Sequence, residues 1–163
     1  MKAAEPDRPY LKPSGPLQPA NAAVALIVDD QGRYLVQLRD PIPTIFFPDH
    51  WGCFGGALEP GESYEAGLAR ELREELDLDI SGLPVSQFTD FSFDFGFAGG
   101  GVIYRRFFEV RVADGSIERL RLGEGREMRM FSGPDLLRHQ VVPYDRFAIW
   151  MHCYRSELAR PHA

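Results

Sequence analysis

Cysteine is scarce in this chain, with only Cys53 and Cys153 among 163 residues. The two stand far apart and form no CxxC pair, which argues against a zinc site. Long apolar runs are also missing: none approaches the roughly 18–20 residues that a membrane span needs, and the N-terminus has no signal-peptide core. We therefore expect free, buried thiols, a reducing compartment and a cytoplasmic protein without a membrane partner.

An excess of positive charge is the next absence. The formal net charge is −6, which argues against a nucleic-acid partner bound by neutralising many phosphates. An anionic small-molecule substrate would then need local positive charge from a metal ion or from arginine and lysine.

The prolines divide the chain. Residues 1–19 hold five of the 13 prolines, a density that neither a strand nor a helix interior tolerates. We interpret this segment as an extended N-terminal arm and residues 20–160 as one domain, a length that suits a single hydrophobic core.

The remaining sequence predicts two β-hairpins, further short strands and two principal helices. Strands are expected at 22–28, 33–39, 51–54, 88–97, 102–112 and 129–131. Helices are expected at 63–76, 135–139 and 144–158. This mixture favours an α+β fold or an α/β/α sandwich.

The segment 63–76 is the clearest helix. Ser63 can cap its first turn after a glycine-containing turn. Small and apolar side chains recur at helical spacing and predict a buried stripe; they are Ala66, Leu68, Ala69, Leu72 and Leu76.

Three glutamates on this helix form the most informative feature of the sequence. At about 100° per residue, Glu71, Glu74 and Glu75 fall within an arc of about 100° that borders the buried stripe. Like charges at this spacing repel, and a hard divalent cation such as Mg²⁺ relieves the repulsion. Gly55 and Gly56, which precede the helix, allow backbone to approach a ligand.

A simpler interpretation is available for the same helix. Its glutamates could pair with Arg70 and Arg73 on a solvated surface, which is the commoner fate of a glutamate-rich helix taken alone. The preceding glycines favour the metal site, because a loop carbonyl and the helix carboxylates could hold one cation together.

The stretch from residue 56 to residue 78 resembles the signature of the Nudix hydrolase family. The matching positions are Gly56, Glu62, Arg70, Glu71, Leu72, Glu74, Glu75 and Leu78. Asp77 stands where the family usually has glycine, and aspartate tolerates the left-handed conformation expected there better than most residues.

The resemblance implies an α/β/α sandwich with a mixed β-sheet, and Mg²⁺ or Mn²⁺ as cofactor. It implies that Glu71, Glu74 and Glu75 ligate the metal, with a carbonyl of Gly55 or Gly56. It further implies that Glu62 and Arg70 orient the helix and the loop, and that a homodimer is an open expectation. The acid that accepts a proton from water would come from the box or from a later loop, which leaves four candidates: Glu74, Glu75, Glu124 and Glu127.

Substrate contacts are predicted from residues around the box. Phe47 and Trp51 flank the loop before the glycines and could stack on a base or a sugar, although aromatic residues there are more often core. Arg39, with Arg105 or Arg106 of the second hairpin, could meet phosphates.

Four functions compete. The first is hydrolysis of the diphosphate linkage in a nucleoside diphosphate derivative such as a nucleotide sugar. The second is a nucleoside triphosphate pyrophosphatase, which the box does not distinguish from the first. The third is a non-catalytic regulatory module of the same fold, and the fourth is an isomerase that would use Cys53.

Overall fold

A computed structural model describes residues 20–42, 45–96 and 100–159. The elements are β1 (Ala22–Val28), β2 (Arg33–Leu38), β3 (Trp51–Gly52), β4 (Phe54–Ala57), α1 (Tyr64–Leu76), β5 (Val85–Asp94), β6 (Val102–Arg111), the 3₁₀ turn η3 (Ile117–Arg119), β7 (Glu127–Ser132), α2 (Gly133–Leu136), α3 (Pro143–Cys153) and α4 (Arg155–Leu158). The proline-rich arm expected at 1–19 lies outside the described residues.

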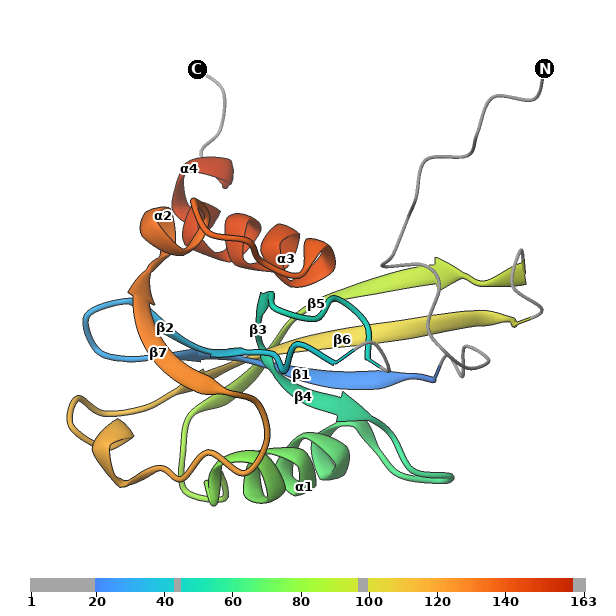
Figure 1. Ribbon diagram of the computed structural model, residues 1–163, viewed down its shortest axis with the longest axis horizontal. Helices are drawn as coiled ribbons and strands as arrows, with labels where there is room; N and C mark the ends of the chain where they lie inside the picture. Colours follow the sequence, from blue (N-terminus) through green and yellow to red (C-terminus); the bar gives the residue numbers. More distant parts are fainter. Residues whose placement is uncertain (1–19, 43–44, 97–99, 160–163) are drawn as a thin grey trace.

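The described strands form one mixed sheet between two helical layers. Its path runs β3-β2-β1-β6-β5, while β4 pairs with β1 and β7 pairs with β2. Among the pairings of these strands with one another, β1 with β6 is parallel and the others are antiparallel. Helix α1 covers one face, and α2, α3 and α4 cover the other (Figure 1). The predicted α/β/α sandwich with a mixed sheet is confirmed.

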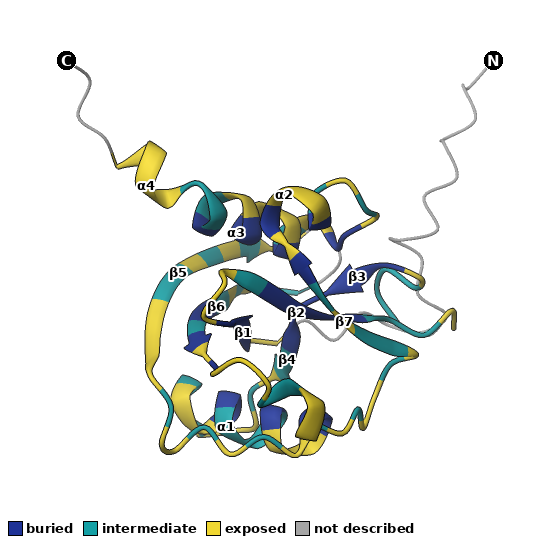
Figure 2. Cartoon of the chain, turned by 90° about the vertical axis from the view of Figure 1, so that its left-hand side faces the viewer, coloured by how far each residue is buried: buried dark blue, intermediate teal, exposed yellow. Residues whose placement is uncertain are grey.

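Strand β1 lies at the centre of the sheet, where it pairs with β2, β4 and β6. All of its residues are buried as a result (Figure 2). Val24 and Leu26 belong to the core beneath α3, which also contains Ile149. Ala25 and Ile27 belong to the core beneath α1. Strands buried on both faces read as continuous apolar runs, which is the pattern of this segment.

Helix α1 begins and ends as its sequence predicts. The hydroxyl of Ser63 accepts a hydrogen bond from the Ala66 N–H at 3.2 Å. Asp77 ends the helix in the left-handed conformation, with φ of 54°, and its N–H donates to the carbonyl of Arg73. Aspartate thus fills the place of the helix-ending glycine, at a position where few side chains are tolerated.

The stripe beneath α1 differs from the prediction at two positions. The three leucines expected there are fully buried, but Ala66 is exposed and Ala69 is only half-buried, and Gly67 takes a buried place. A Cβ at Gly67 would lie 2.3 Å from the Leu58 side chain, so the loop before the helix packs directly on its backbone.

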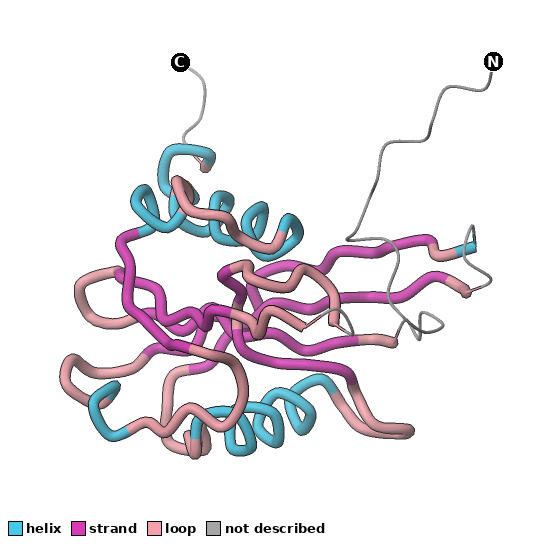
Figure 3. The backbone as a smooth tube through the Cα atoms, in the orientation of Figure 1, coloured by secondary structure: helices cyan, strands magenta, loops and turns pink. Residues whose placement is uncertain are grey.

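Several boundaries also differ from prediction (Figure 3). The strand expected at 88–97 is β5 at Val85–Asp94, and the strand expected at 129–131 is longer, as β7 at Glu127–Ser132. The strand expected at 51–54 is divided, because β3 pairs with β2 and β4 pairs with β1. The short helix begins earlier, at Gly133, where the Ser132 side chain caps it. The C-terminal helix is interrupted at Tyr154, whose ψ of 17° leaves helical geometry. Among the described residues, no helix is long and apolar enough to cross a membrane.

Leu72 tests the packing of α1 on the sheet. We expect Leu72→Ala to lower the free energy of unfolding by about 2–5 kcal/mol, because the side chain is fully buried and its removal leaves a cavity. Urea unfolding followed by circular dichroism measures the change. The neighbouring exposed variant Arg73→Ala should cost less than about 1 kcal/mol. A similar small loss for Leu72→Ala would contradict this packing.

Candidate active site

Two glycines of β4 bring the backbone against α1 and β1. Gly55 has φ of 120°, and a Cβ there would lie 2.3 Å from the carbonyl oxygen of Ala23 on the paired strand. A Cβ on Gly56 would lie 2.8 Å from the carboxyl group of Glu71. Glycine is required at the first position by conformation and at the second by the carboxylate that occupies the space.

Glu75 is the most buried acid of the helix, with 6% of its surface exposed. Its carboxylate accepts a hydrogen bond from the Gly55 N–H at 2.7 Å and a longer one from the Gln37 amide at 3.4 Å. Burial raises its pKa to about 7, and the neighbouring charges of Glu71 and Glu124 act in the same direction. The two hydrogen bonds oppose this rise.

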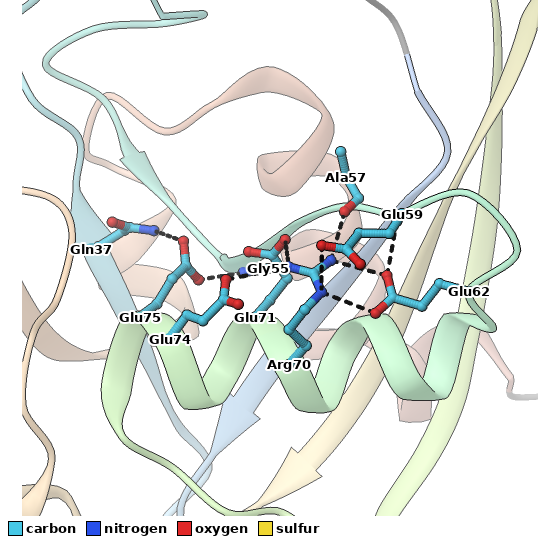
Figure 4. A network of polar contacts seen from close by, with 9 residues as sticks. All are labelled: Gln37, Gly55, Ala57, Glu59, Glu62, Arg70, Glu71, Glu74 and Glu75. Carbon is cyan, nitrogen blue, oxygen red and sulfur yellow. Dashed lines mark hydrogen bonds and ion pairs between the residues drawn. The ribbon is translucent and has the colours of Figure 1, made fainter.

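Arg70 connects the acids on the other side of the helix (Figure 4). Its guanidinium donates to both carboxylate oxygens of Glu62, at 2.9 and 3.0 Å, and to Glu71 at 2.8 Å. It also reaches the carbonyl of Ala57 at 3.0 Å and Glu74 at 3.3 Å. The contact with Ala57 ties the loop before the helix to the helix itself, as the orienting role proposed for this arginine requires.

The three helix acids therefore differ in environment. Burial raises the pKa of Glu71 even though Arg70 opposes the rise, and Glu74 and Glu124 add to it. The hydrogen bonds from Arg70 lower the pKa of Glu62 instead. The Glu74 side chain is 60% exposed, and among the described residues its ion-pair partner is Arg70. On a helical wheel Glu74 lies about 60° from Glu71, on the side away from the buried leucines, which agrees with this outward position.

The loop with Glu124 lies beside these acids and is held at both ends. The Gly123 N–H donates to the Glu75 carbonyl at 2.7 Å, and the Arg126 N–H donates to the Leu38 carbonyl at 2.9 Å. Side chains at the two flanking glycines would collide with α1 and with Gln37. Close packing thus explains these glycines.

Glu127, the other loop candidate, lies elsewhere. It is the first residue of β7, where it pairs with Leu38, and its carboxylate is bound by Arg129. It lines neither the cavity at Glu75 and Glu124 nor a second, aromatic cavity bordered by Phe47 and Tyr144. The geometry brings Glu124 to Glu75 and leaves Glu127 outside.

A polar cavity of about 410 Å³ lies at these acids. Its wall includes Gln37, Arg39, Asp40, Glu75 and Glu124. Arg39, predicted to meet phosphate, is a cation of this wall, and its Nε donates to the carbonyl of Phe46 at 3.0 Å. Phe46 in turn contributes to the wall of a second cavity.

The second cavity, of about 320 Å³, is aromatic. Phe46, Phe47, Phe93, Phe95 and Tyr144 contribute to its wall, together with Arg105. Phe47 therefore lies where a stacked ring could reach it. Trp51 does not: it is 7% exposed, packs against Phe131 in the core beneath α3, and lines neither cavity. The prediction that Trp51 contacts the substrate is therefore wrong, because its side chain is buried.

The two arginines of the second hairpin point to opposite faces of the sheet. Arg105 pairs with Asp145 of α3 at 3.2 Å and stacks on Tyr144, whereas Arg106 pairs with Asp90 and covers Tyr64. Neither lines the polar cavity. Asp145 joins Arg105 and the Cys53 backbone, which are 40 and 92 residues away in the sequence, so no local pattern indicated its role.

Cys53 is unsuited to the isomerase chemistry considered above. Its thiol is buried, and burial and the Asp145 carboxylate raise its pKa well above the ordinary value. A nucleophilic cysteine needs the thiolate, which this environment disfavours. Both cysteines are free, as expected, but only Cys53 is buried and Cys153 is half-buried. Gln37 is a polar contact that sequence reasoning missed; its signal was an amide between the apolar residues Val36 and Leu38 of β2.

The oxygen atoms gathered here are of the kind that a hard divalent cation prefers as ligands. Glu71 and Glu75 supply carboxylate oxygens beside the glycine backbone of β4. Both have raised pKa values, which a bound cation would lower again. Within the described ranges, no three acids, histidines or cysteines already converge as a cage. The reason is visible in Figure 4: Arg70 holds Glu71 and Glu74, while Gly55 and Gln37 hold Glu75.

The family model for the NUDIX domain matches residues 18–150. The chain belongs to the Nudix family. A nucleoside triphosphatase, NudI of Enterobacter sp., is 38% identical over 69 residues, which are 41% of this chain and 48% of that protein. A Nudix hydrolase of Deinococcus radiodurans is 34% identical over 70 residues, or 41% of each chain. The matched stretches thus span less than half of either curated relative.

Solved structures share the Nudix fold over most of the chain. The E. coli dihydroneopterin triphosphate pyrophosphohydrolase aligns with a TM-score of 0.66 and 18% identity, over 82% of this chain and 94% of its own. A Deinococcus radiodurans protein aligns with a TM-score of 0.67 and 22% identity, over 89% of both chains. At such identities the likeness concerns the fold.

Stability should depend on the titration of Glu75. Because its pKa in the folded protein is about 7 and its ordinary value is 4.5, folding favours the protonated form. That contribution is complete below pH 4.5 and is lost as the pH rises through 7. The free energies of unfolding of Glu75→Gln and of the unsubstituted protein are compared in EDTA. Their difference should change by about 2–3 kcal/mol in favour of the variant between pH 5 and 8. Urea unfolding measures it, and parallel pH profiles would refute the assignment.

Gly56→Ala should weaken metal binding while the fold is kept. The new methyl group competes with the Glu71 carboxylate for one space, so we expect about a tenfold or larger loss of Mg²⁺ affinity. Isothermal titration calorimetry with MgCl₂ measures the affinity. Gly82→Ala is the matched control, since a Cβ there meets nothing within 4 Å. Equal affinities in the two variants would show that Glu71 does not bind the ion.

Proposed function

We propose that this chain hydrolyses a phosphoanhydride bond of a nucleoside triphosphate with Mg²⁺ or Mn²⁺ as cofactor. The observation that carries the proposal is the gathering of Glu71 and Glu75 on the glycine backbone of β4, with Glu124 beside them at a polar cavity. Membership of the Nudix family supports the reaction class.

Glu71, Glu74 and Glu75 would hold the cation, with a carbonyl of Gly55 or Gly56. When bound, the ion supplies neutralisation of phosphate charge and a water molecule of lowered pKa. With Glu71 and Glu74 as ligands, Arg70 would keep its bonds to Glu62 and Ala57 and so hold the loop and the helix in register.

Glu124 is the proposed proton acceptor. It lines the same cavity as Glu75 and reaches it from a loop that is anchored at both ends. Glu75 has its carboxylate engaged by Gly55 and Gln37, and Glu127 lies outside the cavity. A carboxylate near the attacking water can accept its proton and so assist the reaction by about 10²–10⁴-fold.

The two cavities divide the substrate between them. The aromatic cavity, with Phe46, Phe47 and Tyr144 in its wall, suits a flat heteroaromatic ring. The polar cavity suits the phosphates, where Arg39 supplies a cation opposite the acids. Arg39 also donates to the Phe46 carbonyl, so one side chain joins the two compartments.

Among the alternatives, the nucleotide-sugar substrate finds no support. NudI is named for nucleoside triphosphates and the E. coli neighbour for dihydroneopterin triphosphate, while a C. elegans neighbour is named for Ap4A; none of the three is named for a nucleotide sugar. A non-catalytic module would be expected to lack acids of the box, and all of them are present.

A substrate screen with matched variants tests the proposal. The four ribonucleoside triphosphates, the deoxy forms and UDP-glucose are incubated with Mg²⁺ or Mn²⁺, and the products are separated by ion exchange. We expect release of pyrophosphate and a nucleoside monophosphate, and a loss of kcat of about 10²-fold or more in Glu75→Gln and in Glu124→Gln.

Glu65→Gln, an exposed acid in the first turn of the same helix, should retain activity. Hydrolysis of UDP-glucose alone would overturn the choice of substrate. Full activity in Glu75→Gln would overturn the site.

A further inference from the structure

Arg105 is a charged residue in the wall of an otherwise aromatic and aliphatic cavity. It lies on β6 opposite Ala22 on one side and Phe91 on the other, so its side chain projects toward α3. The side chain is 17% exposed. Water does not solvate this guanidinium fully, and charged side chains are seldom buried unless they have partners within the protein.

The guanidinium is fixed in place by three groups. Its plane lies over the Tyr144 ring, 4.3 Å from the centroid, and 5.7 Å from that of Phe107. Its Nη2 donates to Asp145 at 3.2 Å. The other carboxylate oxygen of Asp145 accepts from the Cys53 N–H at 2.9 Å, so the acid is itself anchored to the strand segment beside the cavity.

Most of the donors of Arg105 are nevertheless unused. The guanidinium has five N–H donors, and the bond to Asp145 is its one hydrogen bond to other described residues. Its Nε is buried and has no hydrogen-bond partner in the described part of the chain. A buried donor in a native protein calls for an acceptor, and a ligand in the adjoining cavity can provide one.

We propose that Arg105 is a specificity-determining residue that selects rings carrying an oxo group over rings carrying an amino group in the same place. The inference rests on the function proposed above, because it concerns the ring of that substrate. Arginine donates and does not accept, so it matches the paired O6 and N7 acceptors of a 6-oxopurine. A 6-aminopurine presents a donor at the first of these positions and leaves the guanidinium unsatisfied.

Two nucleotide pairs test this selection with a minimal change of ligand. ITP and ATP differ in the oxo or amino group at position 6, and UTP and CTP differ in the same way at position 4. In the full-length chain with Mg²⁺, kcat/KM should be at least tenfold higher for the oxo member of each pair. Sites that hydrogen-bond one polar group discriminate strongly against analogues that lack it.

Arg105→Met should reduce both ratios to about one, mainly by weakening the oxo substrates. Because that change leaves Asp145 buried without its partner, the double variant Arg105→Met with Asp145→Asn provides a form without either charge. Arg106→Met is the matched control: it removes the neighbouring arginine, which pairs with Asp90 on the opposite face. Its ratios should equal those of the unsubstituted chain.

Binding of the monophosphates separates the two proposals. Calorimetry should give tighter binding of IMP than AMP and of UMP than CMP, by tenfold or more, whether or not the chain turns over triphosphates. Such binding without hydrolysis would overturn the proposed function and leave the role of Arg105 in place. Hydrolysis with ratios near one would overturn the role of Arg105 alone. Equal losses for all four nucleotides in the Arg105 variants would assign it a structural role only.

Discussion

The hydrogen bond between the Gly55 N–H and Glu75 is the contact around which the site is built. It joins the helix to the strand at a point where only glycine fits, because the backbone of β1 fills the space of a side chain. The bond also keeps a carboxylate inside the protein, where its charge is poorly solvated. Fold stability and a capacity for cations therefore meet at one residue.

Arg70 offsets the negative charge of the acids from the solvent side of the helix. It neutralises part of the acidic cluster in the absence of an ion, and through Ala57 and Glu62 it fixes the loop that presents the glycines. The same guanidinium holds Glu71 and Glu74 away from a closed cage. The acids proposed to hold a cation are thus already gathered, each with a partner within the protein.

The two cavities show why a family signature leaves the substrate open. Glu71, Glu74 and Glu75 belong to α1, inside the signature, and the polar cavity forms where the loop of Glu124 reaches Glu75. The aromatic cavity draws on the second hairpin, the segment before β3 and the start of α3. Residues that would recognise a ring, Arg105 and Tyr144 among them, lie outside the signature, so the signature does not specify them.

The sequence by itself determined the elements and the acidic helix. Periodicity placed α1 and its leucines, the serine cap and the aspartate end, and the wheel separated outward Glu74 from buried Glu75, since these depend on local geometry. Long-range contacts decided the rest: the burial of Trp51, the division of β3 from β4, the choice of Glu124 over Glu127, and the pairing of Arg105 with Asp145. Periodicity along a strand or helix fixes which face a side chain occupies, but only the packing of distant segments decides what that face meets.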